Sequence, residues 1–417
     1  MLRLWNSHWW VTRRPCRKDD FDRRHSNGVY FAELLRRREH KLLDKEHKDF
    51  RKWVRGFAEK EIAPHASEID ASEKPSMEVL KKLGEVGLMG IPLPEEHGGA
   101  GLDNLSYAIA IEEVSRVCGS TGLFLAAHIS LGATPFHLFG NEEQKKKYLV
   151  PLSKGEIIGA FGLTEPEAGS DAGATRTTAV LDGNQWVING TKCFITSGRL
   201  ASVVVITAVT DKSKRKKGIS SIIVEKGTPG FSYGKEEKKL GVRGTDTSEL
   251  VFEDCRVPKE NLLGKEGEGY KQFLTILDGG RISIGAMALG IAQGALENSV
   301  KYAQERAQFG KLIGELQAIQ VMLADMATEV EAARWLLYHA AQLEDSQSRF
   351  VKEAAMAKLF ASKVAVRTGL NAIQTHGGYG YMRDYPLERM FRDAKLTEIG
   401  EGTSQIQQLV IARELFR

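Results

Sequence analysis

The chain has 417 residues, which is long enough for more than one domain. Its 42% hydrophobic and 27% charged residues are typical of an ordinary globular protein. The formal net charge of +4 is uneven, because residues 1–40 hold 10 Lys or Arg against 5 Asp or Glu and the remainder holds 48 against 49. A body with a net charge of −1 argues against nucleic-acid binding by the fold itself.

Cysteine usage and hydropathy add two exclusions. No apolar run approaches the length of a membrane span, so we expect no stable membrane association. The cysteines are too widely spaced for typical metal ligands, so we expect no metal site and a reducing compartment: Cys16, Cys118, Cys193 and Cys255.

Residues 1–41 form a basic extension unlike the rest of the chain. Tryptophans and arginines are mixed in its first 17 residues, and no acidic residue precedes Asp19. We expect a disordered arm; a cleaved or untranslated upstream segment and a mitochondrial presequence are the alternatives. The arginines favour a presequence, whereas the shortage of serine and the acids at Asp19–Asp22 do not. The expected location is therefore the bacterial cytoplasm, or the mitochondrial matrix if the extension is a presequence.

Residues 42–151 predict a helical domain. Between Phe50 and Phe57, apolar residues recur at spacings of three and four. We expect Pro64 to end this helix and Pro151 to end the domain.

Residues 152–262 predict a compact β domain. Their β-branched runs are separated by Gly, Asn and Asp turns, and the charged run Lys212–Lys217 is expected at a solvated hairpin tip. The runs lie at residues 186–190, 203–207, 219–224 and 250–252.

Residues 263–417 return to long helical periodicity and predict a helical bundle. Small residues along Ile282–Gly290 should allow close helix packing. The segments 319–343 and 350–373 have apolar positions suited to the same bundle.

A turn near the end of the chain carries the most distinctive carboxylate. Glu401 lies between Gly400 and Gly402, where the backbone can approach a ligand closely. Thr403 and Ser404 then offer an N-cap to the next helix. The turn is either a simple helix cap or a platform for a catalytic group.

Two other stretches bear on that choice: Phe161-Gly-Leu-Thr-Glu-Pro-Glu-Ala-Gly-Ser-Asp171 and Gln374-Thr-His-Gly-Gly-Tyr-Gly-Tyr381. Together with the Glu401 turn they resemble the acyl-CoA dehydrogenases, FAD enzymes that oxidise acyl-CoA thioesters, in order and spacing over residues 42–417. The short-chain (butyryl-CoA) branch is the most similar in appearance. The resemblance implies an α+β fold: an N-terminal helical domain, a small central β-barrel or sandwich domain and a C-terminal four-helix bundle.

The resemblance also implies FAD-dependent α,β-dehydrogenation of a short-chain acyl-CoA to the trans-2-enoyl-CoA, as in fatty acid β-oxidation. Electrons would pass to an electron-transfer flavoprotein. Glu401 matches the family's base, and in a closed site its pKa should rise. Some relatives instead place the base on a C-terminal-domain helix, where this chain has Gly280. Gly400 stands where the family often has Tyr, so the pocket wall beside the base need not match.

For the cofactor, the resemblance implies two sets of FAD contacts. The isoalloxazine end would touch Phe161, Gly162, Leu163, Thr164, Gly169, Ser170, Phe194, Ile195 and Thr196, with Phe194 where the family commonly has Trp. The adenosine pyrophosphate end would touch Arg306, Gln317, Gln374, Thr375, His376, Gly377 and Gly378 of a neighbouring subunit, together with Thr403, Ser404 and Gln405. The alternatives are an ordinary Gly/Ser turn at 161–170 and a surface salt bridge at Arg306. Sharing a cofactor implies an oligomer, the family's homotetramer built as a dimer of dimers.

The substrate contacts implied by the resemblance are Ser170, Asp278, Gly279, Gly280, Arg281 and Gly402. A neutral acyl chain is favoured, because no Arg or Lys lies between Gly119 and Gly140, where dicarboxylyl-CoA relatives place a cation. A branched or alicyclic acyl-CoA is an alternative substrate. An acyl-CoA oxidase and a non-catalytic binding protein on the same fold are alternative functions, although Glu401 argues against the second.

Overall fold

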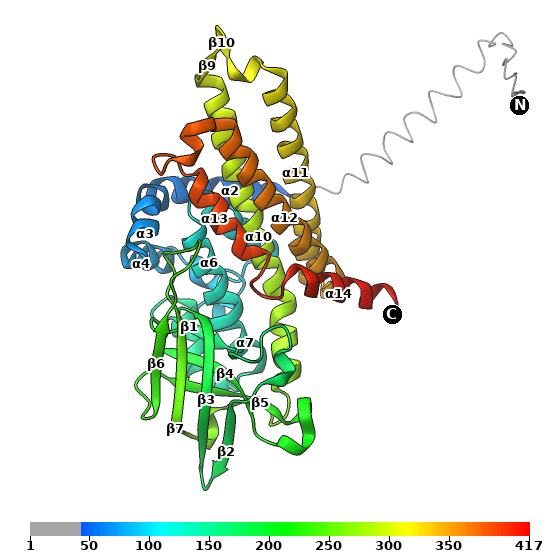
Figure 1. The fold of residues 1–417 in the computed structure, drawn as a ribbon. Helices are drawn as coiled ribbons and strands as arrows, with labels where there is room; N and C mark the ends of the chain where they lie inside the picture. Colours follow the sequence, from blue (N-terminus) through cyan, green and yellow to red (C-terminus); the bar gives the residue numbers. More distant parts are fainter. Residues whose placement is uncertain (1–42) are drawn as a thin grey trace, which may run out of the picture. The chain divides into compact units, whose positions relative to one another are not determined.

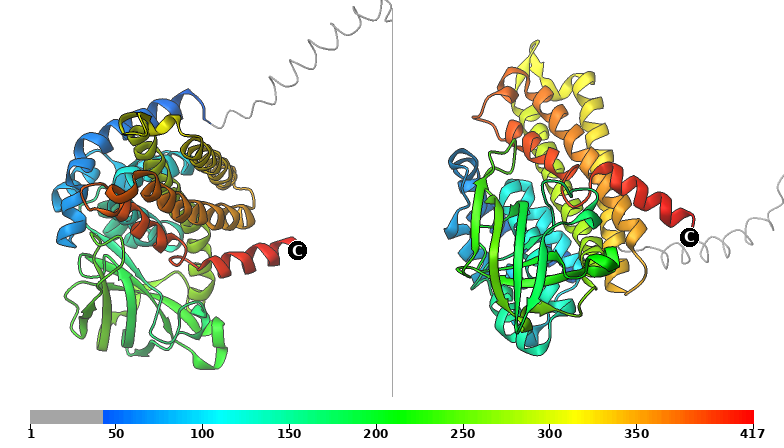
Figure 2. Two further views of the ribbon diagram at one scale, coloured as in Figure 1. Left: turned by 45° about the horizontal axis from the view of Figure 1, so that its top comes forward. Right: turned by 60° about the horizontal axis from the view of Figure 1, so that its bottom comes forward.

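A helical segment, a β-sheet and a helical bundle follow one another along residues 43–417, the part of the chain that the computed structural model describes (Figure 1). The predicted α+β class, with helical N- and C-terminal domains around a central sheet, is confirmed. Figures 1 and 2 show the N-terminal helices, in blue and cyan, beside both the green sheet and the bundle. The predictions for residues 1–41 lie outside the described residues.

The N-terminal segment is helical almost throughout, but two of its predicted breaks were wrong. The chain continues helically from Phe57 through Pro64, because Pro64 occupies the start of a 3-10 turn, where its missing N–H is not needed. Pro151 likewise lies in the first turn of a helix, so the break follows Ser153. The helices are α2 (Lys45–Phe57), α3 (Ala66–Ser72), α4 (Met77–Glu85), α5 (Asn104–Val117), α6 (Gly119–Ala127), α7 (Thr134–Phe139), α8 (Glu142–Gln144) and α9 (Val150–Ser153).

The central sheet has the strand order β6-β7-β3-β2-β4-β5-β8, with β1 parallel to β4. One residue pair, Thr178 with Val209, joins β2 to β4, and the two halves enclose a common apolar core around Trp186. All four predicted runs lie in strands. The strands are β1 (Gly159–Gly162), β2 (Thr178–Asp182), β3 (Gln185–Thr196), β4 (Val203–Val209), β5 (Ile219–Glu225), β6 (Phe231–Glu236), β7 (Thr247–Pro258) and β8 (Leu262–Leu263).

The C-terminal segment is a bundle around one long helix, and its small residues permit the close packing that the sequence predicts. A Cβ on Gly290 would lie 2.2 Å from the Glu112 carbonyl oxygen of α5, so only glycine fits there. The helices are α10 (Gly269–Glu305), α11 (Gln317–Asp345), α12 (Val351–His376), α13 (Leu387–Thr397) and α14 (Ser404–Leu415). Between α10 and α11, a short hairpin of β9 (Ala307–Gln308) and β10 (Lys311–Leu312) lies at the end farthest from the sheet (Figure 1).

The prediction that no apolar segment approaches the length of a membrane span was wrong. In residues 43–417, the helical stretches Gly119–Phe139 and Gly269–Glu305 are long and apolar enough to qualify by composition. In each, 72% of the span-length window is buried inside the protein. Their apolar character is therefore accounted for by the core.

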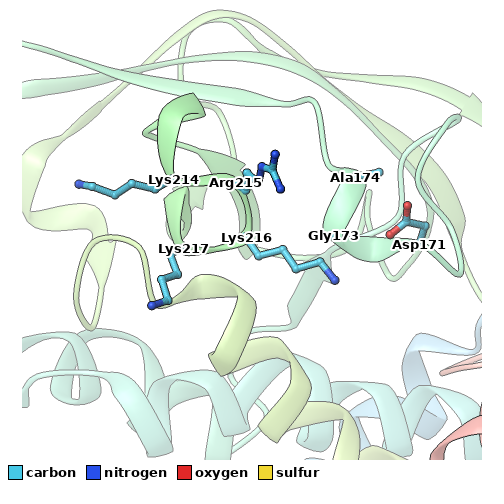
Figure 3. A pocket seen from close by; sticks show the side chains of 7 residues that line it. All are labelled: Asp171, Gly173, Ala174, Lys214, Arg215, Lys216 and Lys217. Atoms are coloured by element: carbon cyan, nitrogen blue, oxygen red, sulfur yellow. The ribbon is translucent and has the colours of Figure 1, made fainter.

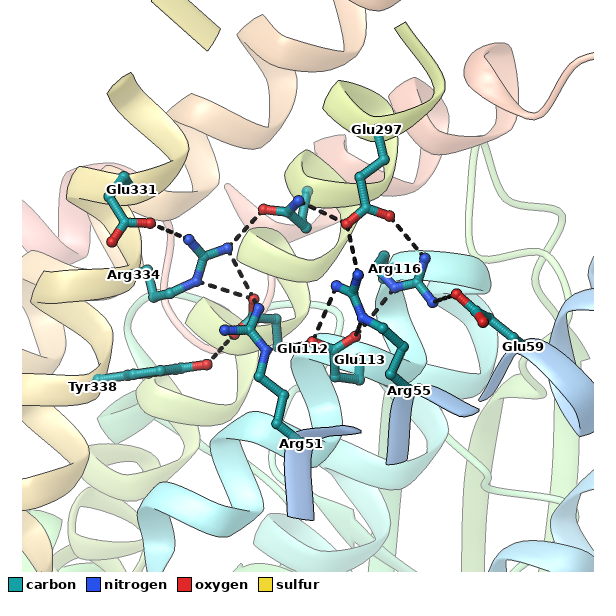
Figure 4. A network of polar contacts seen from close by, with 11 residues as sticks. Arg51, Arg55, Glu59, Glu112, Glu113, Arg116, Glu297, Glu331, Arg334 and Tyr338 are labelled. Atoms are coloured by element: carbon teal, nitrogen blue, oxygen red, sulfur yellow. Dashed lines mark hydrogen bonds and ion pairs between the residues drawn. The ribbon is translucent and has the colours of Figure 1, made fainter. Parts of the chain in front are cut away.

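A buried ionic network joins α2, α5, α10 and α11 (Figure 4). Two neighbouring carboxylates of α5, Glu112 and Glu113, are completely buried. Glu112 accepts from Arg51 at 2.8 Å and from Arg334 at 3.1 and 3.2 Å, and also from the Tyr338 hydroxyl. Burial favours the neutral form of Glu113, but the guanidinium groups of Arg55 and Arg51 outweigh it and hold the carboxyl pKa below the ordinary value. Arg116 also donates to this carboxylate, at 3.2 Å.

Removing one charge from this network should make the protein less stable to unfolding. Glu112→Gln is expected to lower the free energy of unfolding by about 3–5 kcal/mol, because it removes the fully buried charge that pairs with the buried Arg334 and the half-buried Arg51. Glu331→Gln is the matched control, since Glu331 also pairs with Arg334 but its side chain is 55% exposed. The control should lose less than about 1 kcal/mol. Urea unfolding measures both, and equal losses would contradict the assignment of stability to the buried pair.

Candidate active site

The turn between α13 and α14 holds Glu401 in an unusual backbone conformation. Glu401 has φ of 50° and Gly402 has φ of 93°, so two successive residues lie in the left-handed region. The predicted N-cap is confirmed at Thr403, whose Oγ1 accepts from the Ile406 N–H at 3.3 Å. Capping thus explains the start of α14, but it does not explain the conformation of Glu401.

The Glu401 carboxylate points into the protein rather than into solvent. Its Oε2 atom is buried and has no hydrogen-bond partner among the described residues. A Cβ on Gly280 would lie 2.0 Å from this oxygen, so the carboxylate occupies space that a side chain at position 280 would need. Burial raises the pKa of Glu401 to about 8, and the charges of Lys358 and Arg281 offset part of this rise. The sequence predicts the same upward shift of the Glu401 pKa for a base in a closed site.

Three polar residues that the sequence reasoning missed surround this turn. Lys358 of α12 donates to the Gly402 carbonyl at 2.7 Å, and Gln407 of α14 donates to the same oxygen at 2.9 Å. Tyr107 of α5 lies within electrostatic range of Glu401: burial, and then the charge of Glu401, raise the tyrosine pKa. The sequence offers one sign of such residues: a polar residue inside an apolar helical run, as in Ala354-Ala-Met-Ala-Lys358.

The loop after β1 is fixed by buried partners on its inner side. Phe161 and Gly162 end the strand and are buried, whereas Gly169 and Ser170 are exposed. The Leu163 carbonyl accepts from Lys192 Nζ at 3.2 Å, and the Thr164 carbonyl accepts from the Cys193 N–H at 2.8 Å. Lys192 is itself buried and pairs with Glu165 at 2.7 Å. These bonds hold the loop against β3 and leave its Gly–Ser tip free.

Phe194 lies beside this loop on a bulge in β3. Its φ of 59° interrupts the pairing with β7 between Lys192 and Ile195, and it leaves the ring 63% exposed. The next residues return to the strand, with Ile195 buried and Thr196 half-buried. An exposed aromatic ring next to an exposed Gly–Ser tip offers a flat apolar surface with polar backbone at its edge. These residues fit a flat, polar-edged ring such as isoalloxazine.

Four predicted substrate residues lie together on α10. Arg281 is buried and forms an ion pair with Asp278. A Cβ on Gly279 would lie 2.9 Å from a carboxylate oxygen of Glu344, so this glycine also faces a neighbouring side chain. Gly280 faces Glu401, which brings the predicted base and this predicted substrate segment together.

A second group of predicted residues lies at the other end of α10. Arg306 follows its last residue and lies over the Tyr379 ring at 5.5 Å from the centroid. Gly280 and Arg306 are 26 positions apart, which is about 39 Å at roughly 1.5 Å per helical residue. One chain therefore does not bring Arg306 to its own Glu401. The exposed residues of this group are Gln317, Gln374, Gly377 and Gly378.

The side chains of Thr375 and His376 have structural roles at this end. Thr375 donates to the Asn371 carbonyl at 2.8 Å, and the His376 ring contacts the Ala372 carbonyl at 2.9 Å. His376 also stacks on Tyr302 at 4.0 Å between centroids. Both side chains are buried, so any contact with a ligand would have to come from backbone.

The remaining predicted cofactor residues stand at the Glu401 turn. Thr403 is occupied as the N-cap, and Ser404 Oγ makes a long contact of 3.5 Å with the Glu398 carbonyl. Gln405 is exposed. The three therefore lie at a different end of the bundle from Arg306 (Figure 1).

An open basic pocket of about 570 Å³ lies between the exposed loop after β1 and the β4–β5 connection. As predicted, the basic run connects two antiparallel strands. Figure 3 shows Lys216 extending toward Gly173 and Asp171, whereas Lys214 extends the other way. The pocket is lined by Asp171, Gly173, Ala174, Lys214, Arg215, Lys216 and Lys217. Within the described residues, no group of three or more His, Cys, Asp or Glu could hold a metal ion.

Known proteins match this chain over nearly its whole described length. Models of the acyl-CoA dehydrogenase N-terminal, middle and C-terminal domains match residues 44–156, 160–255 and 267–416. A probable acyl-CoA dehydrogenase of Bacillus subtilis is 56% identical, covering 90% of this chain and 99% of the relative. The short-chain specific acyl-CoA dehydrogenase of Clostridium acetobutylicum is 54% identical, with the same coverage.

Solved structures show the same fold. A chain from the study of the electron transferring flavoprotein of Acidaminococcus fermentans has a TM-score of 0.89 and 53% identity, covering 90% of this chain and 99% of that one. An acyl-CoA dehydrogenase of Bacillus anthracis complexed with FAD has a TM-score of 0.84 and 38% identity, covering 90% and 67%.

The raised pKa of Glu401 predicts that the protein loses a measurable amount of stability as the pH rises. In the folded chain this pKa is about 8, above the ordinary value of 4.5. A raised carboxyl pKa contributes stability that is complete below pH 4.5 and is lost as pH rises through 8. Glu401→Gln cannot ionise, so its stability relative to wild type should increase between pH 5 and pH 8. Chemical unfolding at both pH values measures the difference, and a constant difference would contradict the raised pKa.

Proposed function

Because the chain belongs to the acyl-CoA dehydrogenase family of FAD-dependent oxidoreductases, we propose that it dehydrogenates a short-chain acyl-CoA to the trans-2-enoyl-CoA, with Glu401 as the base. The short chain length is proposed from the similarity to the short-chain specific acyl-CoA dehydrogenase of Clostridium acetobutylicum. A neutral acyl chain remains favoured by the lack of Arg and Lys between Gly119 and Gly140.

One observation carries the assignment of the base: the buried, unpartnered Oε2 of Glu401 lies against Gly280. An unpaired buried carboxylate is costly, so a fold retains one only where the carboxylate has another use. Position 280 is the place from which some relatives supply their base. Here the carboxylate of Glu401 fills that space. A glutamate at position 401 and a glutamate at position 280 would therefore place their carboxylates at the same location.

The proposed proton transfer uses the ionised form of Glu401. The carboxylate takes the proton from the α-carbon of the thioester and becomes neutral, a form that its buried surroundings favour. Its pKa of about 8 keeps it basic enough to remove a carbon-bound proton while part of the population is ionised near pH 7.

The thioester oxygen gains negative charge as the proton leaves, so a donor must lie near it. The backbone N–H of Glu401 donates to no carbonyl or side chain of the described residues, and it is the candidate donor. FAD, when bound, supplies the acceptor for the hydride that leaves the β-carbon, which no side chain can provide. Phe194 and the 163–170 loop are the proposed surfaces for its ring, with Ser170 also touching the substrate.

The basic pocket suits the nucleotide end of CoA. Three lysines and one arginine line it, whereas Asp171 is its one acidic lining residue. Phosphate groups bind such clusters through charge-assisted hydrogen bonds. The pocket begins one residue after Ser170, so one extended thioester could pass from the Gly–Ser tip into it.

Two partners complete the proposal. Arg306, Gln317 and Gln374 are too far from Glu401 in their own chain, so we propose that they bind the FAD of a second subunit in a homotetramer. A monomer on size-exclusion chromatography that keeps its FAD would contradict this. The electron acceptor is an electron-transfer flavoprotein, as suggested by the Acidaminococcus fermentans structure, and a dye-free assay with that acceptor tests it. The cytoplasmic or mitochondrial location stays a prediction.

Anaerobic reduction of the bound flavin by butyryl-CoA tests the base. Glu401→Gln should slow reduction by more than the roughly 10²–10⁴-fold usual for a general base, because no water can replace it in a closed site. In the wild type the rate should rise with pH to a plateau above about 8. Pairing Glu401→Gly with Gly280→Glu should recover part of the rate, because the first change vacates the space that the second needs. A Glu401→Gln rate within about tenfold of wild type would place the base elsewhere.

The pocket proposal is tested with two substrates that differ in the nucleotide. Arg215→Ala should weaken binding of butyryl-CoA by about tenfold or more, an effect that shrinks at high salt, because a charge-assisted phosphate contact is lost. Butyryl-pantetheine, which lacks the nucleotide, should bind the variant and wild type equally. Lys212→Ala is the matched control, since Lys212 belongs to the same run but does not line the pocket. Equal weakening of both substrates would contradict a nucleotide site.

A further inference from the structure

A buried lysine lies beneath the turn that carries Glu401. Lys358 of α12 is 0% exposed, and its ammonium group donates to the Gly402 carbonyl at 2.7 Å. Burying an ammonium group is costly, and a neutral donor would satisfy the carbonyl equally well. The charge of this side chain, and not only its hydrogen bond, therefore needs a physical reason.

The hydrogen bond acts on backbone that is otherwise hard to hold. Glu401 and Gly402 both have positive φ, and a left-handed conformation is unfavourable for a glutamate. Two side chains restrain this pair through the Gly402 carbonyl: Lys358 at 2.7 Å and Gln407 at 2.9 Å. Gln407 also donates to the Glu401 carbonyl at 3.2 Å. The turn is thus anchored from α12 and from α14.

The charge acts on the carboxylate itself. Lys358 and Arg281 favour the ionised form of Glu401, and Glu401 in turn favours the charged form of Lys358, whose pKa burial lowers to about 8. The other groups near the pair are few. Tyr107 of α5 lies within electrostatic range of Glu401, and Glu344 of α11 lies within range of Tyr107. Glu398, at the end of α13, acts on Lys358. Gln407 of α14 is uncharged.

We propose that Lys358 is a positioning residue for the proton abstraction: its ammonium group holds the Gly402 carbonyl, and its positive charge favours the ionised form of Glu401. The proposal rests on the proposed role of Glu401 as the base. Lys358 and Gln407 then have different roles: both hold the Gly402 carbonyl, but only Lys358 brings a charge.

The pH dependence of flavin reduction distinguishes these two anchors. In Lys358→Met, the midpoint of the rate profile should move up from about 8 by about 1–3 pH units, because an opposite charge is lost. The rate at pH 7 should therefore fall by about tenfold or more. Gln407→Leu, the matched control, should lower the rate without moving the midpoint. An unmoved midpoint in Lys358→Met would overturn the proposal.

Stability measurements test the same pair without catalysis. Unfolding of wild type, Lys358→Met, Glu401→Gln and the double variant at pH 8 gives a double-mutant cycle, with an expected coupling of about tenfold or more in the unfolding equilibrium. Should Lys358→Met not fold, Lys358→Gln replaces it in both experiments, because it removes the charge but keeps a donor. Additive effects would overturn the proposal. If Glu401→Gln reduces flavin normally while the cycle shows coupling, the assignment of the base fails and the ionic pair stands.

Discussion

The burial of one carboxylate against one glycine is the constraint on which the rest of the site depends. Glu401 can place Oε2 beside α10 only because position 280 has no Cβ. It reaches that place only from a left-handed backbone, which needs restraint from two neighbouring helices. The carboxylate then loses solvation and gains no hydrogen bond, so the site has a local cost in stability. Such costs are characteristic of functional sites rather than of cores optimised for folding.

The long helix α10 connects this cost to the stability of the whole bundle. Its Gly280 faces Glu401, and its Gly290 touches the Glu112 carbonyl, on the residue whose side chain is the centre of the buried ionic network. That network fixes α5 against α2 and α11, and α5 also carries Tyr107, which lies within electrostatic range of Glu401. The helices around Glu401 are therefore held together by the charge pairs of this network. A site with a strained turn can persist because the helices that carry it are rigid.

The sequence predicts the class of fold and four of the strands, because each leaves a periodic pattern, whereas the prediction of Glu401 as the base depends on the resemblance to the acyl-CoA dehydrogenases. The alternation of β-branched runs and turns located β3, β4, β5 and β7, and the Gly-Glu-Gly turn marked Glu401. The breaks predicted at Pro64 and Pro151 are absent, since a proline in the first turn of a helix does not end it. The burial of the apolar helices was harder to predict from the sequence than their secondary structure. The apolar helices of the core have the composition of membrane spans, and nothing local reveals that other helices cover them.

Pairs that meet only in the tertiary structure could not be predicted at all, and two buried lysines illustrate why. Lys192 and Lys358 each donate to a backbone carbonyl in a loop that is proposed to belong to the site, Lys192 to Leu163 and Lys358 to Gly402. Periodicity gives no sign of either partner.

Their chemistry nevertheless differs in one decisive respect. Lys192 also bonds the Glu165 carboxylate at 2.7 Å, and that carboxylate accepts from Thr175 and from backbone N–H groups, so it has little capacity left for a proton. The pKa of Glu165 falls to about 2 as a result. Within residues 43–417, Lys358 bonds only the Gly402 carbonyl beside Glu401, and Oε2 of Glu401 has no hydrogen-bond partner. A cation that stabilises a carboxylate without a hydrogen bond to it leaves that oxygen able to accept a proton, which is the condition a base requires.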